Sequence, residues 1–247
     1  MRRRFFVDRF DQNAKSAVLE GEDAHHLGNV LRAQPGQLYE LSDGSAAWLA
    51  RIESVRRDRV EFALVEQIAA ISPVADFTLL LSIVNFDAFE WALEKATELG
   101  VSTIVPLAAG RSEKNLVAAA AKRSERWRKI LFEASQQSRR LRVPALTDMV
   151  EAEQAFASQS AKLCILFSER SDAPPLKQVL ANADTARQRV AILAIGPEGG
   201  WTDAEFAAAR AAGFREASLG PLILRTETAV VSALSVLNFW WAPAGEQ

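Results

Sequence analysis

The segment 195–200 (IGPEGG) has the residue types of a loop that binds a ligand through its backbone. It follows the apolar run 190–195, and Thr202 with Glu205 then has the spacing of a helix capping box. Glycines let a ligand approach backbone N–H and C=O groups, which can read the edge of an adenine. In α/β proteins, a loop at the carboxyl end of a parallel strand lies where ligands bind. A tight turn without a ligand is the alternative, because short glycine motifs recur by chance.

The charges of this loop bear on the kind of ligand. Helix N-termini attract phosphate, but Glu198 lies in the loop, Asp203 lies in the first helical turn, and no lysine is present. A phosphate would meet two carboxylates there. The loop therefore favours a ligand that carries an adenine and a cationic centre.

A second segment, 219–229 (LGPLILRTETA), again joins a strand end to a helix through Gly-Pro. Arg225 and Glu227 are charges set among apolar residues, which points to a paired or functional role. A salt bridge at the helix start is an equally good interpretation.

Cations gather in the stretch 122–142. Lys122, Arg126 and Lys129 are spaced to share a helix face, with Arg123 and Arg128 beside them, and Arg139, Arg140 and Arg142 follow. A solvated helix face is the usual explanation of such a run. In a chain of net charge −2, the density of the cluster favours contact with RNA phosphates, without sequence selectivity.

The elements that must position these residues fall into two groups. Short strands are expected at 4–6, 17–19, 38–41, 47–55 and 60–65, with one helix from Glu22 through His26 to Leu31, which indicates a small β-barrel. After the Pro-containing segment 70–74, nearly all-apolar runs at 78–84, 103–107, 163–167, 190–195 and 216–219 alternate with helical periodicity. Expected helices include Phe89 to Leu99, one around Trp127, and a last one from Val230 to Trp241. We predict domains 1–71 and 72–247, the second an α/β domain with a parallel sheet.

Composition narrows the remaining functions. The 247 residues are 49% hydrophobic and 24% charged, as in an ordinary globular protein without long apolar runs, so we expect a cytoplasmic protein with no membrane segment. The single cysteine, Cys164, lies in an apolar run and is expected to be a buried thiol. The only histidines, His25 and His26, are adjacent and are poor joint ligands, so no metal is expected.

These motifs together resemble those of the ribosomal RNA small subunit methyltransferase E family, in the SPOUT class of trefoil-knotted methyltransferases. Beside the two glycine segments, the resemblance covers 94–101 (EKATELGV), Arg111-Ser112, 137–144, and His26 with 30–32 (VLR). It spans nearly the whole chain. The resemblance implies a PUA-like barrel that helps to hold RNA, a knotted catalytic domain, a homodimer, and S-adenosylmethionine as cofactor. The implied reaction methylates N3 of a uridine in 16S ribosomal RNA of the small subunit.

The resemblance also assigns residues. Those implied to surround the cofactor are Leu193, Ile195, Gly196, Pro197, Glu198, Gly199, Gly200, Leu219, Gly220, Leu222, Ile223, Leu224, Arg225 and Thr228. Candidate RNA contacts are Arg32, Arg111, Lys122, Arg126, Lys129, Arg139 and Arg142. The chain departs from the family at 85–89 (NFDAF), where basic residues, a glycine and a methionine are usual, and at Leu222, where arginine is usual.

Methyl transfer from a sulfonium needs alignment of the reacting atoms more than an oxyanion hole. N3 of uracil must lose a proton, and the uridine must be unstacked. We expect Arg225 to stabilise the uracil anion, and Glu227 or Glu198 to orient the base or accept the proton. The apolar end of the last helix, Trp240-Trp241, predicts a dimer surface. Competing interpretations are a related enzyme acting on transfer RNA or a ribose 2′-hydroxyl, a non-catalytic RNA-binding assembly factor, and, weakest, a nucleotide-phosphate enzyme.

Overall fold

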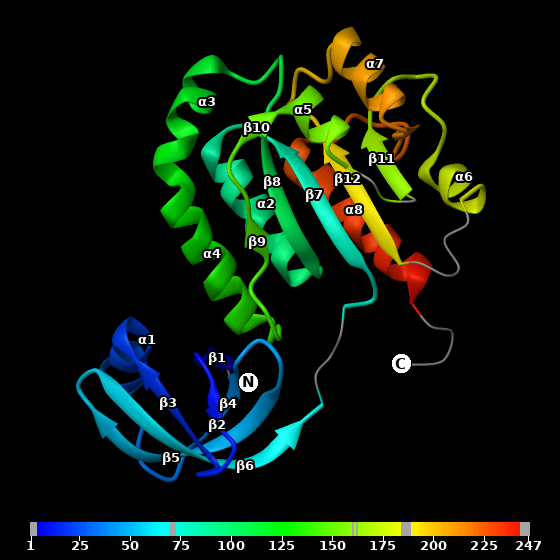
Figure 1. Ribbon diagram of the computed structural model, residues 1–247. Helices are drawn as coiled ribbons and strands as arrows, with labels where there is room; N and C mark the ends of the chain where they lie inside the picture. The colour runs from blue at the N-terminus through cyan, green and yellow to red at the C-terminus, as the bar shows by residue number, and fades with distance from the viewer. Residues whose placement is uncertain (1–3, 70–72, 160, 162, 184–188, 243–247) are drawn as a thin grey trace. The chain divides into compact units, whose positions relative to one another are not determined.

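The computed structural model describes residues 4–69, 73–159, 161, 163–183 and 189–242 (Figure 1). Contacts divide the chain into two compact units. The first contains residues 1–72 and 135–143, and the second contains 73–134 and 144–247. The predicted domain boundary between residues 71 and 72 lies outside the described residues.

The first unit is built on a six-stranded sheet in the order β1-β4-β5-β6-β3-β2. Its strands are β1 (Arg4–Phe6), β2 (Phe10–Asp11), β3 (Ser16–Glu20), β4 (Leu38–Ser42), β5 (Ala47–Arg56) and β6 (Arg59–Ile68). Alternate residues point inward, as in β6, where Val60, Phe62 and Leu64 are buried. Only β1 and β4 pair in parallel; the other neighbours are antiparallel. The expected strands of this module are therefore present, and the two-residue β2 is additional.

The expected helix of this unit forms in two parts. Helix α1 (Gly21–His25) runs directly into a π-helical turn over His26–Val30. Ala24 and Leu27 are fully buried in the core of the unit. The wider π turn ends near Arg32, which has a positive φ of 50°.

Residues 135–143 belong to the first unit through polar contacts that cross more than ninety residues of sequence. The buried Arg4 guanidinium pairs with Glu40 at 3.0 Å and donates to the Arg139 carbonyl at 2.6 Å. Arg139 in turn lies 3.4 Å from Glu40. Ser42 donates to the Leu141 carbonyl at 2.8 Å, so strand β4 holds this stretch along its length.

The second unit is an α/β domain whose seven strands are all parallel, as predicted. The order is β10-β8-β7-β12-β11-β13, and β9 also pairs with β8. The strands are β7 (Asp76–Ser82), β8 (Val101–Ala108), β9 (Ala145–Leu146), β10 (Val150–Glu151), β11 (Leu163–Phe167), β12 (Val190–Ile195) and β13 (Arg215–Ala217). Every residue of β11 is buried, as expected for a strand covered on both faces.

Helices cover both faces of this sheet. Helices α2 (Phe86–Glu98) and α8 (Thr226–Trp241) pack against each other, and Figure 1 shows both behind the strands. Helices α5 (Ala152–Ala157) and α7 (Asp203–Ala211) share a core with the other face. Helices α3 (Lys114–Ala120), α4 (Ser124–Gln137) and α6 (Leu176–Ala181) complete the unit, except that the last turn of α4 belongs to the first unit.

Specific contacts fix the helices that frame the site. The Asn238 side chain donates to the Leu99 carbonyl at 2.9 Å and so caps the end of α2 from α8. Trp241 is buried and stacks on Phe77 with ring centroids 5.8 Å apart. None of the helices in the described ranges is long and apolar enough to cross a membrane. The trefoil knot stays a prediction.

Candidate functional site: two adjoining cavities at the glycine loops

The two glycine segments meet at the carboxyl end of the parallel sheet, around a cavity of about 590 Å³. Ten of the predicted cofactor residues line it: Ile195, Gly196, Pro197, Glu198, Gly200, Leu219, Gly220, Leu222, Ile223 and Leu224. Leu222 and Ile223 are among the most exposed apolar residues, at 78% and 82%. Apolar side chains left open beside a cavity are available to a ligand.

A buried hydroxyl joins the two loops. Thr226, the first residue of α8, is 4% exposed and donates from Oγ1 to the Gly196 carbonyl at 3.0 Å. Gly196 directly follows β12, so this bond ties the start of α8 to the end of the central strand. The cavity therefore has walls that are fixed to each other before any ligand enters.

The backbone of the first loop is held in a form that needs glycine. Gly200 has a φ of +68°, which L side chains rarely adopt. A Cβ on Gly196 would lie 3.0 Å from the ring of Trp201, so the indole packs directly on the backbone there. Trp201 is itself buried, and its Nε1 donates to the Phe167 carbonyl at 2.9 Å.

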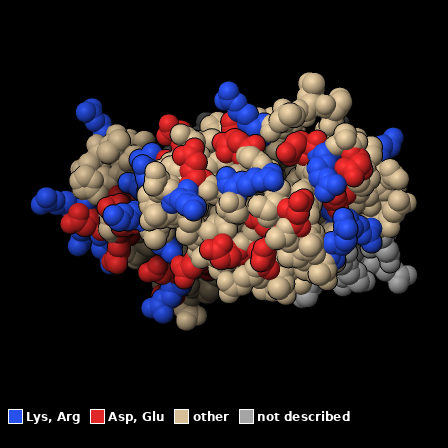
Figure 2. Space-filling view, turned by 90° about the horizontal axis from the view of Figure 1, so that it is seen from above, with Lys and Arg blue, Asp and Glu red and all other residues tan. Residues whose placement is uncertain are grey.

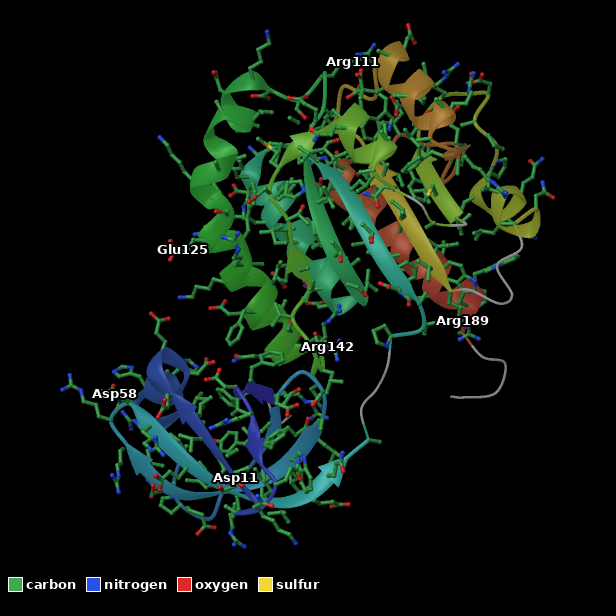
Figure 3. The ribbon with its side chains drawn as sticks, in the orientation of Figure 1. Asp11, Asp58, Arg111, Glu125, Arg142 and Arg189 are labelled. Atoms are coloured by element: carbon green, nitrogen blue, oxygen red, sulfur yellow. The ribbon has the colours of Figure 1, made fainter. Side chains whose placement is uncertain are left out.

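The helix after this loop begins as the sequence predicts. Thr202 and Glu205 form the complete capping box of α7. The buried Glu205 carboxylate also accepts from the Gly110 N–H at 2.8 Å, which fixes the loop after β8 beside the start of α7. Gly110 precedes Arg111, which Figure 3 shows at this end of the unit, near α7. Nη1 of Arg111 donates to the Gly199 carbonyl at 2.9 Å.

In the structure Arg111 braces the glycine loop, and its contact with RNA stays a prediction. Gly199 does not line the cavity and serves instead as the acceptor for Arg111. Leu193 lies fully buried in the middle of β12 and supports the strand without reaching the cavity.

A second cavity, of about 1,190 Å³, adjoins the first. Its lining residues come from α2, the first glycine loop and the start of α8: Asn85, Asp87, Ala88, Trp91, Glu198, Arg225, Glu227 and Thr228. Glu198 borders both cavities. All three predicted catalytic residues thus share one cavity, and Arg225 and Thr228 lie in it rather than in the first. Within the described residues, neither Arg225 nor Glu227 forms an ion pair, so the helix-start salt bridge is not formed.

Several lining residues were missed by sequence reasoning. Phe167 ends β11, Ser168 and Glu169 follow it, and Trp201, Thr226 and Ala229 complete the first cavity. The β11 residues could have been found, because 163–167 was expected to be a parallel strand, and the carboxyl ends of such strands share an edge. Asn85 and Asp87 have no such signal; Asn85 accepts from the Asp87 N–H at 2.9 Å as the N-cap of α2.

The cationic side chains predicted to contact RNA differ in whether they already have an ion-pair or hydrogen-bond partner in the protein. Arg126 and Arg123 both pair with the buried Glu90 of α2, at 2.8 and 3.3 Å. Arg142 donates to the Gly44 carbonyl, and Arg139 pairs with Glu40, both inside the first unit. Lys122 and Lys129 have no ion pair among the described residues. Figure 2, seen from the end where α7 lies, shows cations and carboxylates interspersed on that face.

Comparisons with known proteins agree with this architecture. The RNA methyltransferase domain family matches residues 71–238, and the RNA methyltransferase PUA domain matches 19–65. A ribosomal RNA small subunit methyltransferase E of Bacillus subtilis is 31% identical over 96% of both chains, and one of Synechocystis is 33% identical over 90% of this chain and 73% of the relative.

Solved structures give the same result. The Neisseria gonorrhoeae ribosomal RNA small subunit methyltransferase E bound to S-adenosyl methionine matches with a TM-score of 0.87 and 30% identity over 98% of both chains. A putative methyltransferase from Legionella pneumophila, also in complex with that cofactor, matches with a TM-score of 0.85 and 28% identity over 97% of this chain and 98% of the other. The chain belongs to the ribosomal RNA small subunit methyltransferase E family, with a PUA domain before its RNA methyltransferase domain.

Proposed function

We propose that this protein methylates N3 of a uridine in 16S ribosomal RNA of the small subunit, with S-adenosylmethionine as methyl donor. The observation that carries the proposal is the pair of adjoining cavities: one is walled by the two glycine loops, and the other is lined by Arg225, Glu227 and Glu198. The first has the place and the lining residues for a cofactor, and the second has charged and aromatic side chains for an acceptor base.

The residues of the first cavity fit an adenosyl ligand that carries a positive charge. Residues of the segment 219–224 line the cavity, where backbone groups can read an adenine edge, and the exposed Leu222 and Ile223 can cover its faces. Glu198 and Glu169 make the cavity acidic, which suits a sulfonium and disfavours a phosphate. When bound, S-adenosylmethionine supplies an electrophilic methyl group.

The second cavity provides the groups that the acceptor needs. As the new N3–CH₃ bond forms and the S–CH₃ bond breaks, the N3 proton must leave the base. Arg225 faces this cavity and would stabilise the negative charge on the uracil carbonyl oxygens. Glu227, or Glu198 at the junction of the cavities, would orient the base or accept the proton. Trp91, 43% exposed in the same cavity, offers a ring on which an unstacked base can lie.

RNA binding would rest on the PUA domain and on the cations of the stretch 122–142. Among the described residues Lys122 and Lys129 form no ion pair, whereas Arg126 pairs with Glu90. We expect Lys129→Ala to weaken RNA binding and to reduce its salt dependence, and Arg126→Ala also to disturb the packing of α4 on α2.

We also propose a homodimer that forms through α8. Trp241 packs inside its own unit, so the predicted Trp240-Trp241 surface is corrected: the open apolar residues are Val236, Phe239 and Trp240. Phe239 is 83% exposed. Replacing it with aspartate should halve the mass measured by light scattering, whereas Val65→Asp, at an exposed apolar position of the first unit, should leave it unchanged. A wild-type monomer at assay concentration would refute the dimer.

The test of the proposed reaction uses labelled S-adenosylmethionine and small ribosomal subunits that lack the modification. After nuclease digestion, mass spectrometry should find one new N3-methyluridine in 16S RNA. Label on transfer RNA or on a ribose 2′-oxygen would support the related-enzyme alternatives instead. Cofactor binding without transfer to any RNA would favour the assembly factor.

A further inference from the structure

Glu169 places a carboxylate in the first cavity from an unexpected element. It lies two residues beyond β11 and lines the cavity together with both glycine segments. The side chain is exposed, and among the described residues no hydrogen bond or ion pair engages its carboxylate. The neighbouring Arg170 turns away to Asp172 at 3.3 Å and to the ring of Phe206. The carboxylate is therefore free to accept from a ligand.

The place of Glu169 separates it from the reacting atoms. Glu198 borders both cavities, and Arg225 borders only the second, where the acceptor base is proposed to lie. Glu169 borders only the first, next to Phe167 and Ser168 at the strand end. A ligand whose methyl faces the second cavity would meet Glu169 with a part remote from that methyl.

The backbone keeps room for this carboxylate. A Cβ on Gly200 would lie 2.7 Å from Oε1 of Glu169, so the carboxylate rests against the bare α-carbon of the cofactor loop. The positive φ of Gly200, +68°, disfavours any other residue there. The glycine loop and the β11 loop thus lie against each other, with the carboxylate next to Gly200.

We propose that Glu169 accepts hydrogen bonds from the 2′- and 3′-hydroxyls of the cofactor ribose, an inference that rests on the proposed function. An ionised carboxylate is an acceptor only and has two oxygens, and a vicinal diol offers two donors side by side. Acidic side chains recognise ribose hydroxyls in the same way in dinucleotide-binding folds. Backbone groups can read the adenine, but a backbone loop presents no comparable paired acceptor to a diol.

The experiment compares two products of the cofactor by titration calorimetry. S-adenosylhomocysteine has the ribose and the amino-acid tail, whereas 5′-methylthioadenosine has the same ribose without the tail. Glu169→Ala should weaken both by a similar factor of about ten or more, the range for hydrogen bonds to a charged group. The 2′-deoxy form of methylthioadenosine should bind wild type more weakly than the parent does, and should lose little further affinity in the variant.

The control is Asp172→Asn, which removes a carboxylate from the same loop outside the cavity and should change neither affinity. Thermal unfolding of each variant checks that an exposed substitution leaves the fold intact. A loss for S-adenosylhomocysteine alone would assign Glu169 to the amino group and overturn the proposal, as would unchanged affinity for both ligands. A wild-type protein that binds neither ligand would refute the proposed function itself.

Discussion

The hydrogen bond between Thr226 and Gly196 is the link on which the cofactor cavity depends, and it can be cut without changing side-chain shape. Thr226→Val replaces the hydroxyl with a methyl group and leaves the Gly196 carbonyl without its donor. Because Thr226 is 4% exposed, water can replace that donor only if the loop opens. The loss of one such bond with its partner left buried costs about 1–2 kcal/mol.

The same change should appear in binding. If the bond holds the two loops at their binding separation, up to the whole of that free energy is lost from the complex, and affinity for S-adenosylhomocysteine should fall by as much as about five- to thirtyfold. Thr226→Ser is the matched control, since it keeps Oγ and loses only a methyl group. Calorimetry gives the affinities, and thermal unfolding gives a Tm lower by about 2–8 °C for the valine variant. Equal affinities for the valine and serine variants would show that the bond does not organise the cavity.

Three other substitutions or treatments test different parts of the account. Arg225→Ala should reduce methyl transfer far more than cofactor affinity, because the guanidinium faces the acceptor cavity; equal turnover would reject its role. Glu205→Gln keeps an oxygen for Thr202 but turns an amide N–H toward the N–H of Gly110. Urea denaturation should therefore give an unfolding free energy lower by about 1–3 kcal/mol. An unchanged free energy would show that the hydrogen bonds of Glu205 to Thr202 and Gly110 do not stabilise the fold. Burial raises the pKa of the Cys164 thiol, which leaves less thiolate at any pH near neutrality; iodoacetamide should label the native protein much more slowly than the urea-unfolded chain at pH 8, and equal rates would show that the thiol is accessible.

Much of the fold could be predicted because its signals are local. The all-apolar runs at 163–167 and 190–195 coincide with β11 and β12, and the spacing of Thr202 and Glu205 marks the start of α7. Short elements such as β9 and β10, of two residues each, could not be predicted. Such strands exist only because β8 offers them hydrogen-bond partners, and that information lies far away in the sequence.

The residues of the site likewise fall into those with a local sequence signal and those that only the fold brings together. Loop residues 195–200 and 219–224 carry their own pattern of glycine, proline and charge, and the structure brings both around one cavity. Glu169 has an ordinary sequence context, and only the parallel order of β11 beside β12 brings it to the loop. Arg111 has a partner that its sequence context does not reveal: it donates to the Gly199 carbonyl, an acceptor 88 residues away, while its contact with RNA stays a prediction. Charge alone does not reveal which partner a cation has.

The sharing of residues 135–143 with the first unit has a practical consequence for dissecting this protein. A chain cut after the PUA domain would lose Arg4, Glu40 and Ser42. The Arg139 side chain would then lack its ion-pair partner, and the carbonyls of Arg139 and Leu141 would lack their hydrogen-bond donors. Because the first unit takes in residues 135–143 as well, a single cleavage of the chain cannot release the methyltransferase half free of residues that belong to the other unit.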